Sequence, residues 1–286
     1  MTSPSPHTTS PPPCENGRYA ADALRVNSTI KLLDLDGNNI GPEGAVALNQ
    51  GLIENNTLES LWLGNNDLGD VGAAAIAEAS ARVGSKLRLL DLEFNEVGPD
   101  GARSIAKALR GNGSLNTLWL GGNPDLGDEG AEALAEAVGD FSALTELSLQ
   151  HGGLTAEGAR ALGNALRDES SRLEVLWLGG NPNLGDDGAA SLADALCVNS
   201  TLLVLALDGC GLTDEGGATL YSSLEENETI TMLDLDGNGV GDMGVLSLIV
   251  HATKSNRSGA TDNGKLKEAW QLYKKKKNEH KQELRL

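Results

Sequence analysis

Apolar residues recur along the chain in a pattern that repeats every 28 or 29 residues. Each copy reads L-x-x-L-x-L-x-x-N-x-L, as in IKLLDLDGNNI at 30–40 and LESLWLGNNDL at 58–68. Leucines at positions four and six alternate with other residues, which is typical of a short strand with one buried face. We therefore expect eight strands, in copies that begin at Ile30, Leu58, Leu87, Leu115, Leu144, Leu173, Leu202 and Ile230.

A helix is predicted after each strand. One glycine site recurs in every copy, and Leu or Ile follows it by four residues, as Leu48 follows Gly44. A second apolar residue comes four positions later in seven copies, with Ser80 as the exception, and this stripe predicts an amphipathic helix. Thr155 and Thr213 stand where N-caps are expected.

Strands alternating with helices predict an α/β solenoid with parallel strands on one side and helices on the other. Because strands pack at about 4.8 Å and helices at about 8–10 Å, we expect a horseshoe with concave strands and convex helices. Position nine is Asn in six copies and is expected to satisfy backbone groups at the turn. Gly152 and Cys210 replace it in the other two, so the copy with Gly152 should be the loosest.

The two ends differ from the repeats. ADALRVNSTI at 21–30 nearly matches ADALCVNSTL at 193–202, which indicates an N-terminal half-repeat that shields the first full copy. We predict four regions: a disordered Ser/Thr/Pro-rich tail at 1–17, the repeat domain at 18–253, a linker at 254–264 and a basic helix at 265–286.

The charge is unevenly distributed. The chain carries −19 in total, while residues 265–286 carry +5 and residues 1–264 carry −24. An acidic body disfavours nucleic acid and anionic membranes and favours basic protein partners. Two interpretations of the basic helix stay open: its apolar residues cap the last repeat, or it reaches a second partner or the chain's own acidic face.

The compartment is expected to be reducing. The three cysteines have neither a disulfide-framework nor a metal-type spacing, and no signal peptide or membrane span is visible. Five of the six N-x-S/T triplets recur just before a strand, which repeat chemistry explains better than glycosylation. We therefore expect a location in the cytoplasm or nucleus.

The 28/29-residue period, Asn or Cys at position nine and a G-x-x-G-A helix start resemble ribonuclease-inhibitor-type leucine-rich repeats. The resemblance covers residues 19 to about 253. The same repeat type occurs in ribonuclease inhibitor, NOD-like receptors and Ran GTPase-activating protein. It implies the fold and leaves the function open, because such proteins share an architecture and differ in their partners.

Positions five and seven of each copy should form the outward wall of the concave face. Two kinds of repeat alternate there, one with Trp followed by Gly (LWLGNN, LWLGGN) and one with paired acids (LDLDGN, LDLEFN). The predicted partner-binding residues are the acids and tryptophans of these two columns: Asp34, Asp36, Trp62, Asp91, Glu93, Trp119, Trp177, Asp208, Asp234 and Asp236.

The tryptophans are two strands apart, about 10 Å, which predicts no direct stacking between them. An exposed Trp beside a carboxylate suits a Lys or Arg side chain of a partner. The alternative is that each Trp is packing over its glycine neighbours. The leading hypothesis is a protein-binding scaffold that recognises a basic segment on an acidic, Trp-bearing concave face.

No catalytic, cofactor or metal site is predicted. The DLDG strings at 34–37 and 234–237 lack the ligand spacing of a calcium loop, and no phosphate-binding loop occurs. His151 has no Ser or Cys partner at a recognisable spacing. The resemblance leaves two alternatives, a GTPase-activating protein and a sensor module of the NOD-like receptor type. The first is disfavoured because the strand-to-helix loops contain no Lys or Arg.

Overall fold

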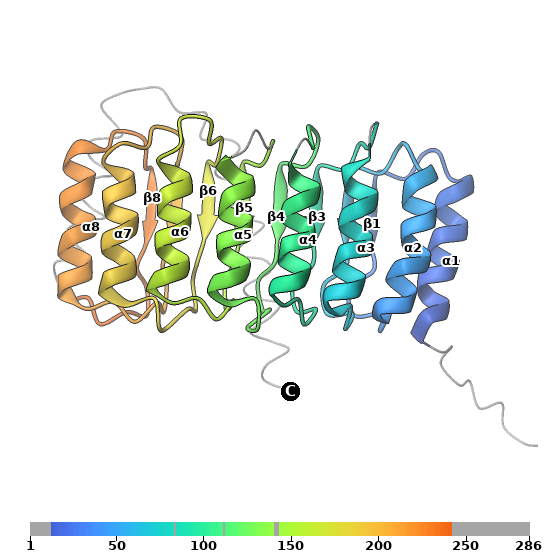
Figure 1. The fold of residues 1–286 in the computed structure, drawn as a ribbon, viewed down its shortest axis with the longest axis horizontal. Helices are drawn as coiled ribbons and strands as arrows, with labels where there is room; N and C mark the ends of the chain where they lie inside the picture. The colour runs from blue at the N-terminus through green and yellow to red at the C-terminus, as the bar shows by residue number, and fades with distance from the viewer. Residues whose placement is uncertain (1–12, 83, 111, 140–142, 242–286) are drawn as a thin grey trace, which may run out of the picture. The chain divides into compact units, whose positions relative to one another are not determined.

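The computed structural model describes residues 13–82, 84–110, 112–139 and 143–241. In this part of the chain one helix is followed by alternating strands and helices (Figure 1). The helices are α1 (Pro13–Val26), α2 (Gly41–Glu54), α3 (Gly69–Ala81), α4 (Pro99–Leu109), α5 (Gly127–Gly139), α6 (Ala156–Leu166), α7 (Gly185–Leu196) and α8 (Asp214–Glu226). The strands are β1 (Leu32–Asp34), β2 (Ser60–Trp62), β3 (Leu89–Asp91), β4 (Thr117–Trp119), β5 (Glu146–Ser148), β6 (Val175–Trp177), β7 (Val204–Ala206) and β8 (Met232–Asp234).

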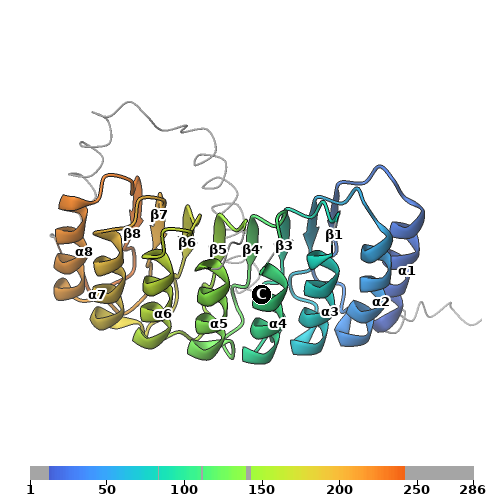
Figure 2. The same ribbon diagram turned by 45° about the horizontal axis from the view of Figure 1, so that its top comes forward.

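The strands form one parallel sheet in chain order, β1 to β8. The register pairs equal positions of neighbouring repeats, so Leu33 lies beside Leu61 and Leu61 beside Leu90. Figures 1 and 2 show the helices side by side on one side of the sheet, also in chain order. The predicted α/β repeat architecture is confirmed.

The core lies between the two layers. Leu61 of β2, Leu63 just after that strand and Ile76 of α3 belong to one core cluster, and all three are fully buried. Each such side chain contributes about 1.5–3 kcal/mol by leaving water, which makes the leucine pattern the main source of stability. Few aromatic residues take part, because the aliphatic side chains of neighbouring repeats fill the space.

The asparagines at position nine connect neighbouring repeats. Asn66 Nδ2 donates to the Leu35 carbonyl oxygen at 2.8 Å, while Asn66 Oδ1 accepts from the backbone N–H groups of Asn38 and Ile40 at 2.9 and 3.2 Å. Cys210 replaces the donor, because its Sγ lies 3.1 Å from the Leu178 carbonyl oxygen. The predicted role of these residues is confirmed.

The asparagines before the strands are also structural. Asn55 is buried, accepts from the backbone N–H of Leu58 at 2.9 Å and donates to the Leu24 carbonyl oxygen at 2.9 Å. Asn112, Asn199 and Asn227 are likewise buried and make equivalent bonds. The N-x-S/T triplets therefore follow from repeat packing, as predicted.

From α3 to α8 the helix starts alternate between two types. In α3, α5 and α7 the first residue is a glycine with a positive φ of 57–59°, a conformation that glycine adopts without strain. The aspartate after it reaches the helix of the next repeat: Asp128 Oδ1 accepts from the backbone N–H groups of Thr155 and Gly158 at 2.8 and 2.9 Å. Thr155 is the predicted N-cap of α6 and accepts from Glu157 N at 3.2 Å.

The N-terminal boundary differs from the prediction. Helix α1 begins at Pro13, so residues 13–17 are helical instead of belonging to a disordered tail. The helix extends further because Gly17 lies close to α2, where a Cβ atom would be 2.2 Å from the Gly44 carbonyl oxygen. Leu24 of α1 joins the core cluster, as expected for a half-repeat. The predictions for 1–12, the last helix of the repeat domain, the linker 254–264 and the basic helix 265–286 lie outside the described residues.

Candidate functional site

The predicted binding residues lie on the side of the sheet that is turned away from the helices. We call this surface, formed by positions three, five and seven of the repeats, the sheet face. Exposed acids stand at both ends of this face, and the acids and tryptophans in the middle are covered to a larger extent. Exposed are Asp34, Asp36 and Asp236; half-buried are Trp62, Glu93 and Asp208; buried are Asp91, Trp119, Trp177 and Asp234.

The prediction of exposed tryptophans is wrong for two of the three. Trp119 and Trp177 expose only 6% and 3% of their surface. The expected absence of contact between tryptophans is also wrong, because the ring centroids of Trp62 and Trp119 are 6.4 Å apart with the planes tilted by 53°. Strand spacing fixes the distance between the backbones, while these long side chains lean across the strand between them.

Glu146 is a residue of the sheet face that the sequence analysis missed. It stands at position three of the fifth repeat and is the first residue of β5, which lies between β4 and β6. Its Oε1 atom accepts hydrogen bonds from Trp119 Nε1 at 3.1 Å and from Trp177 Nε1 at 3.0 Å. One carboxylate therefore holds both indoles, which explains their burial better than a partner-facing orientation does. The sequence did contain a signal for this residue: an acid stands at position three of a repeat whose two neighbours both carry Trp at position five.

Two carboxylates of the sheet face have raised pKa values. Burial raises the pKa of Glu146, and the hydrogen bonds from Trp177 and Trp119 oppose this shift. Burial also raises the pKa of Glu93 to about 7, with further contributions from the negative charges of Asp36 and Glu146. Burial in the middle of the sheet face therefore disfavours the charged form of these two carboxylates.

The alternation of acids and glycines has a steric and hydrogen-bonding cause. Asp36 leans over Gly64 of the next repeat and accepts from its backbone N–H at 2.7 Å. A Cβ at Gly121 would lie 2.9 Å from Glu93 Oε1, and one at Gly179 would lie 2.1 Å from Asp208 Oδ1. Glycine at position seven of the Trp repeats thus leaves room for the acid of a neighbouring repeat.

Three of the aspartates at position five also have a structural role. Asp34 Oδ1 accepts from the backbone N–H of Asp36 at 3.1 Å, and Asp91 and Asp234 make the equivalent bond to the residue two positions later. These bonds close the turn after the strand. The aspartate at position five of these repeats is therefore explained in part by the turn that it stabilises.

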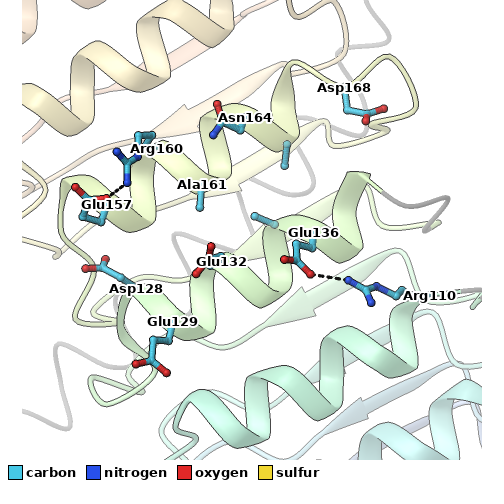
Figure 3. A pocket seen from close by; sticks show the side chains of 12 residues that line it. Arg110, Asp128, Glu129, Glu132, Glu136, Glu157, Arg160, Ala161, Asn164 and Asp168 are labelled. Atoms are coloured by element: carbon cyan, nitrogen blue, oxygen red, sulfur yellow. Dashed lines mark hydrogen bonds and ion pairs between the residues drawn. The ribbon is translucent and has the colours of Figure 1, made fainter.

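A second acidic region lies on the helix side. A groove of about 770 Å³ runs between α5 and α6 and is lined by Glu129, Glu132, Glu157 and neighbouring residues (Figure 3). Arg110 pairs with Glu136 at 2.7 Å, and Arg160 pairs with Glu157. Its acids are exposed, and arginines of the same region neutralise part of their charge.

Other kinds of site were also sought among the described residues. No group of three or more His, Cys, Asp and Glu side chains there could hold a metal ion. No helix in that part of the chain is long and apolar enough to cross a membrane. Burial raises the pKa of the Cys210 thiol to about 12, so this cysteine is a packing residue and a weak nucleophile.

Comparison with solved structures finds similar folds at low identity. The chain is 18% identical to a chain of the Rad7–Elc1 complex from yeast, with a TM-score of 0.53 over 84% of this chain and 68% of that one. It is 20% identical to leiomodin-1 actin-binding site 2 (TM-score 0.43, 57% and 89% covered). It is 17% identical to the tropomodulin C-terminal domain of Caenorhabditis elegans (TM-score 0.44, 53% and 91% covered).

Comparison with curated protein sequences finds no match. The family profile described as Leucine Rich repeat matches residues 26–48, 54–77, 85–106, 111–135, 143–163, 198–220 and 226–248. These segments cover more than half of the sequence and coincide with the strand-and-helix units of the structure. The chain belongs to the leucine-rich-repeat family.

Proposed function

We propose that this protein is a binding scaffold whose sheet face holds a basic segment of another protein. The observation that carries the proposal is the charge of that face: exposed acids stand at both ends, and the half-buried Glu93 and Glu146 stand in the middle. Asp34, Asp36 and Asp236 are exposed, and the half-buried Glu93 has a raised pKa. A basic segment would form ion pairs with exposed acids such as Asp34 and Asp236.

The repeat architecture supports a binding role. A sheet face built from many short strands offers a broad surface with no need for a deep pocket, as repeat proteins generally do. The structurally similar chain with the TM-score of 0.53 belongs to a complex of Rad7 and Elc1, so a chain of this architecture assembles with another protein. We extend this general role to the present chain, with a different partner chemistry set by its own acids.

Several finer statements belong to the same proposal. We infer the ribonuclease-inhibitor type from the 28/29-residue period and the helix that follows each of the strands β1 to β7. A second contact through the basic residues 265–286 and a location in the cytoplasm or nucleus are further parts of it. The GTPase-activating and sensor alternatives stay predictions, and no feature of the sheet face favours them over a scaffold.

The test compares two sets of charge removals. Asp34→Asn, Asp36→Asn and Asp236→Asn together neutralise exposed acids of the sheet face. Glu129→Gln, Glu132→Gln and Glu157→Gln neutralise the same number of exposed acids in the α5–α6 groove. The probe is a fluorescein-labelled ten-residue peptide of alternating arginine and serine, and its affinity is measured by fluorescence anisotropy.

The sheet-face variant should bind the peptide about tenfold more weakly, because each exposed ion pair contributes about 0.2–1 kcal/mol. The groove variant should bind it within about twofold of the wild type, and wild-type affinity should fall as salt is added. Equal losses in both variants would mean that the peptide senses only the net charge, and the proposal would be wrong.

A further inference from the structure

The outer edge of β1, the side turned away from β2, has unused backbone donors. In the second to eighth repeats, the N–H groups at positions two and three donate to the position-two carbonyl oxygen of the repeat before, as Glu59 and Ser60 donate to Lys31 at 2.8 and 2.9 Å. Because β1 is the first strand of the sheet, no described strand precedes it (Figure 2). The equivalent N–H groups of Lys31 and Leu32 therefore have no such acceptor among the described residues.

The carbonyl side of the same edge is also open. In the inner repeats, the position-five carbonyl oxygen accepts from the position-six N–H of the repeat before, as Ala206 accepts from Leu178 at 2.9 Å. Asp34 has the equivalent position in β1, and no described N–H group donates to its carbonyl oxygen from outside the sheet. Helix α1 caps only the turn that follows, since Asn16 Nδ2 donates to the Asn38 carbonyl oxygen at 2.9 Å.

Apolar side chains are incompletely covered beside this edge. Leu32 is 53% exposed, and Ile30 is 37% exposed although the equivalent residues of the other seven repeats are buried. Leu33 and Leu35 are half-buried, whereas their equivalents in the second repeat are fully buried. An added strand would cover these side chains and the open backbone groups at the same time.

Two further observations concern what could protect the edge. A lysine can protect an edge strand from pairing, but the ammonium group of Lys31 is held towards the second repeat by Glu59 Oε1 at 2.6 Å. Residues 1–12, which precede α1, include four prolines and no Leu, Ile, Val, Phe, Tyr or Trp. They therefore have few of the backbone donors and none of the large apolar side chains typical of a strand.

We propose that the outer edge of β1 receives an extended segment of the partner protein as an added strand. The inference rests on the proposed function and states how the basic segment is held. The exposed Asp34 lies both on β1 and on the sheet face, so charge complementarity favours a basic residue beside it. Apolar residues of the segment lie beside Leu32 and Leu33, and its backbone pairs with the Leu32 N–H and the Asp34 carbonyl group.

The experiment separates the backbone donor from the side chain at one position. Leu32→Pro removes the outward N–H group, and proline is tolerated in edge strands where that group faces solvent. Leu32→Ala keeps the N–H group and removes most of the apolar side chain. Val198→Ala is the matched control, because this exposed apolar residue lies in the loop after α7. The probe is the fluorescein-labelled peptide Ser-Lys-Val-Val-Val-Lys-Ser, which reads the same in both directions, and its affinity for the full chain is measured by anisotropy.

We expect Leu32→Pro to bind this peptide about tenfold more weakly than the wild type and Leu32→Ala about threefold more weakly. The additional loss in the proline variant is the size expected for one hydrogen bond. Val198→Ala should bind within about twofold of the wild type. Equal affinities of Leu32→Pro and Leu32→Ala would overturn the added strand. If the sheet-face triple variant still weakens binding of the arginine–serine peptide in that case, the proposed function stands without it.

A second measurement uses only the wild-type protein and covers the case in which Leu32→Pro does not fold. Two twins of the peptide carry two backbone N-methyl groups each, on the lysines in one twin and on the outer valines in the other. Successive N–H groups of a strand point to opposite sides, so one twin should lose about tenfold in affinity and the other less than about threefold. Equal losses would overturn the added strand.

The alternative occupant is a second copy of the chain, which sedimentation distinguishes. We expect the wild type to sediment as a monomer in the absence of peptide. A dimer that Leu32→Pro dissociates would mean that two copies pair at β1, and the proposed strand of another protein would be wrong. If the arginine–serine peptide does not bind the wild type at millimolar concentration, the proposed function fails as well.

Discussion

The protein has two acidic regions that resemble each other in sequence and differ in physical state. On the sheet face, Glu93 and Glu146 are half-buried and their pKa values are raised. In the groove between α5 and α6, Glu136 and Glu157 are exposed and pair with arginines. The charged form of glutamate is therefore destabilised by burial on the sheet face and solvated in the groove.

The difference is the reason why we propose the sheet face and not the groove as the binding surface. The exposed acids of the groove already have water and arginines, so a ligand would gain little there. On the sheet face, Glu93 and Glu146 have lost part of their hydration, so water screens the field of a charge there less completely. Acidic composition alone does not separate these two cases; burial and hydrogen bonding do.

The largest effect is expected at Glu146. Glu146→Ala removes the acceptor of two indole N–H groups, and an unsatisfied buried donor costs about 1–3 kcal/mol. Because the loss of a repelling charge offsets part of this, we expect the free energy of unfolding to fall by about 2 kcal/mol in urea titration. Glu146→Gln, which keeps an acceptor, should lose less than half as much. An alanine variant as stable as the wild type would mean that Glu146 does not hold the indoles.

The pH dependence of stability should come next in size. The pKa of Glu93 is about 7 in the folded chain and near 4.5 when unfolded, so the folded state binds more protons between these values. The free energy of unfolding should therefore fall as the pH rises from about 4.5 to about 7, by about 2 kcal/mol after allowing for its partial exposure. When urea titrations are repeated at several pH values, Glu93→Gln should lose most of this dependence of the unfolding free energy on pH, and Glu132→Gln should retain it. An unchanged pH dependence in Glu93→Gln would contradict the assignment of this effect to Glu93.

A smaller effect is expected from the glycines that accommodate the acids. Gly179→Ala places a Cβ atom against the carboxylate of Asp208, which must move aside. We expect a loss of about 1 kcal/mol in thermal or urea unfolding, as for modest overpacking. Gly113→Ala is the control, since nothing lies within 4 Å of its Cβ position. Equal behaviour of the two variants would argue against the interlocking of acids and glycines.

The smallest effect belongs to the groove. Glu136→Ala removes the ion pair with Arg110. The Glu136 side chain is 63% exposed and the Arg110 side chain is 46% exposed. Such pairs contribute about 0.2–1 kcal/mol, so the change in unfolding free energy should be about 0.5 kcal/mol or less. A loss as large as that of Glu146→Ala would remove the distinction between the two acidic regions.

Most of the fold could be predicted from the sequence because it depends on periodic properties. The buried leucines, the glycine in the first turn of the repeat helices and Asn66 with its equivalents recur at fixed spacing, and neighbouring repeats form equivalent contacts. The start of α1 could not be placed, because it depends on the close approach of Gly17 to Gly44. That contact is tertiary and leaves no period in the sequence.

The candidate site was predictable only in part. The columns of acids and tryptophans were identified correctly as positions on one side of the sheet. Their exposure was not, because Trp119 and Trp177 turn towards Glu146 and Trp62 contacts Trp119. Side-chain direction across strands depends on individual neighbours, and one glutamate at position three of a single repeat changed the outcome for two tryptophans.

The most direct test of the account is the titration of individual carboxyl groups followed by carbon-13 NMR. Glu93 and Glu146 should titrate above the ordinary range for glutamate, with Glu93 near pH 7, and both should shift to lower pKa when the arginine–serine peptide is added. Glu132 in the groove should not respond to the peptide. If Glu93 and Glu146 titrate like solvent-exposed glutamates and ignore the peptide, the sheet face is not the charged binding surface proposed for it.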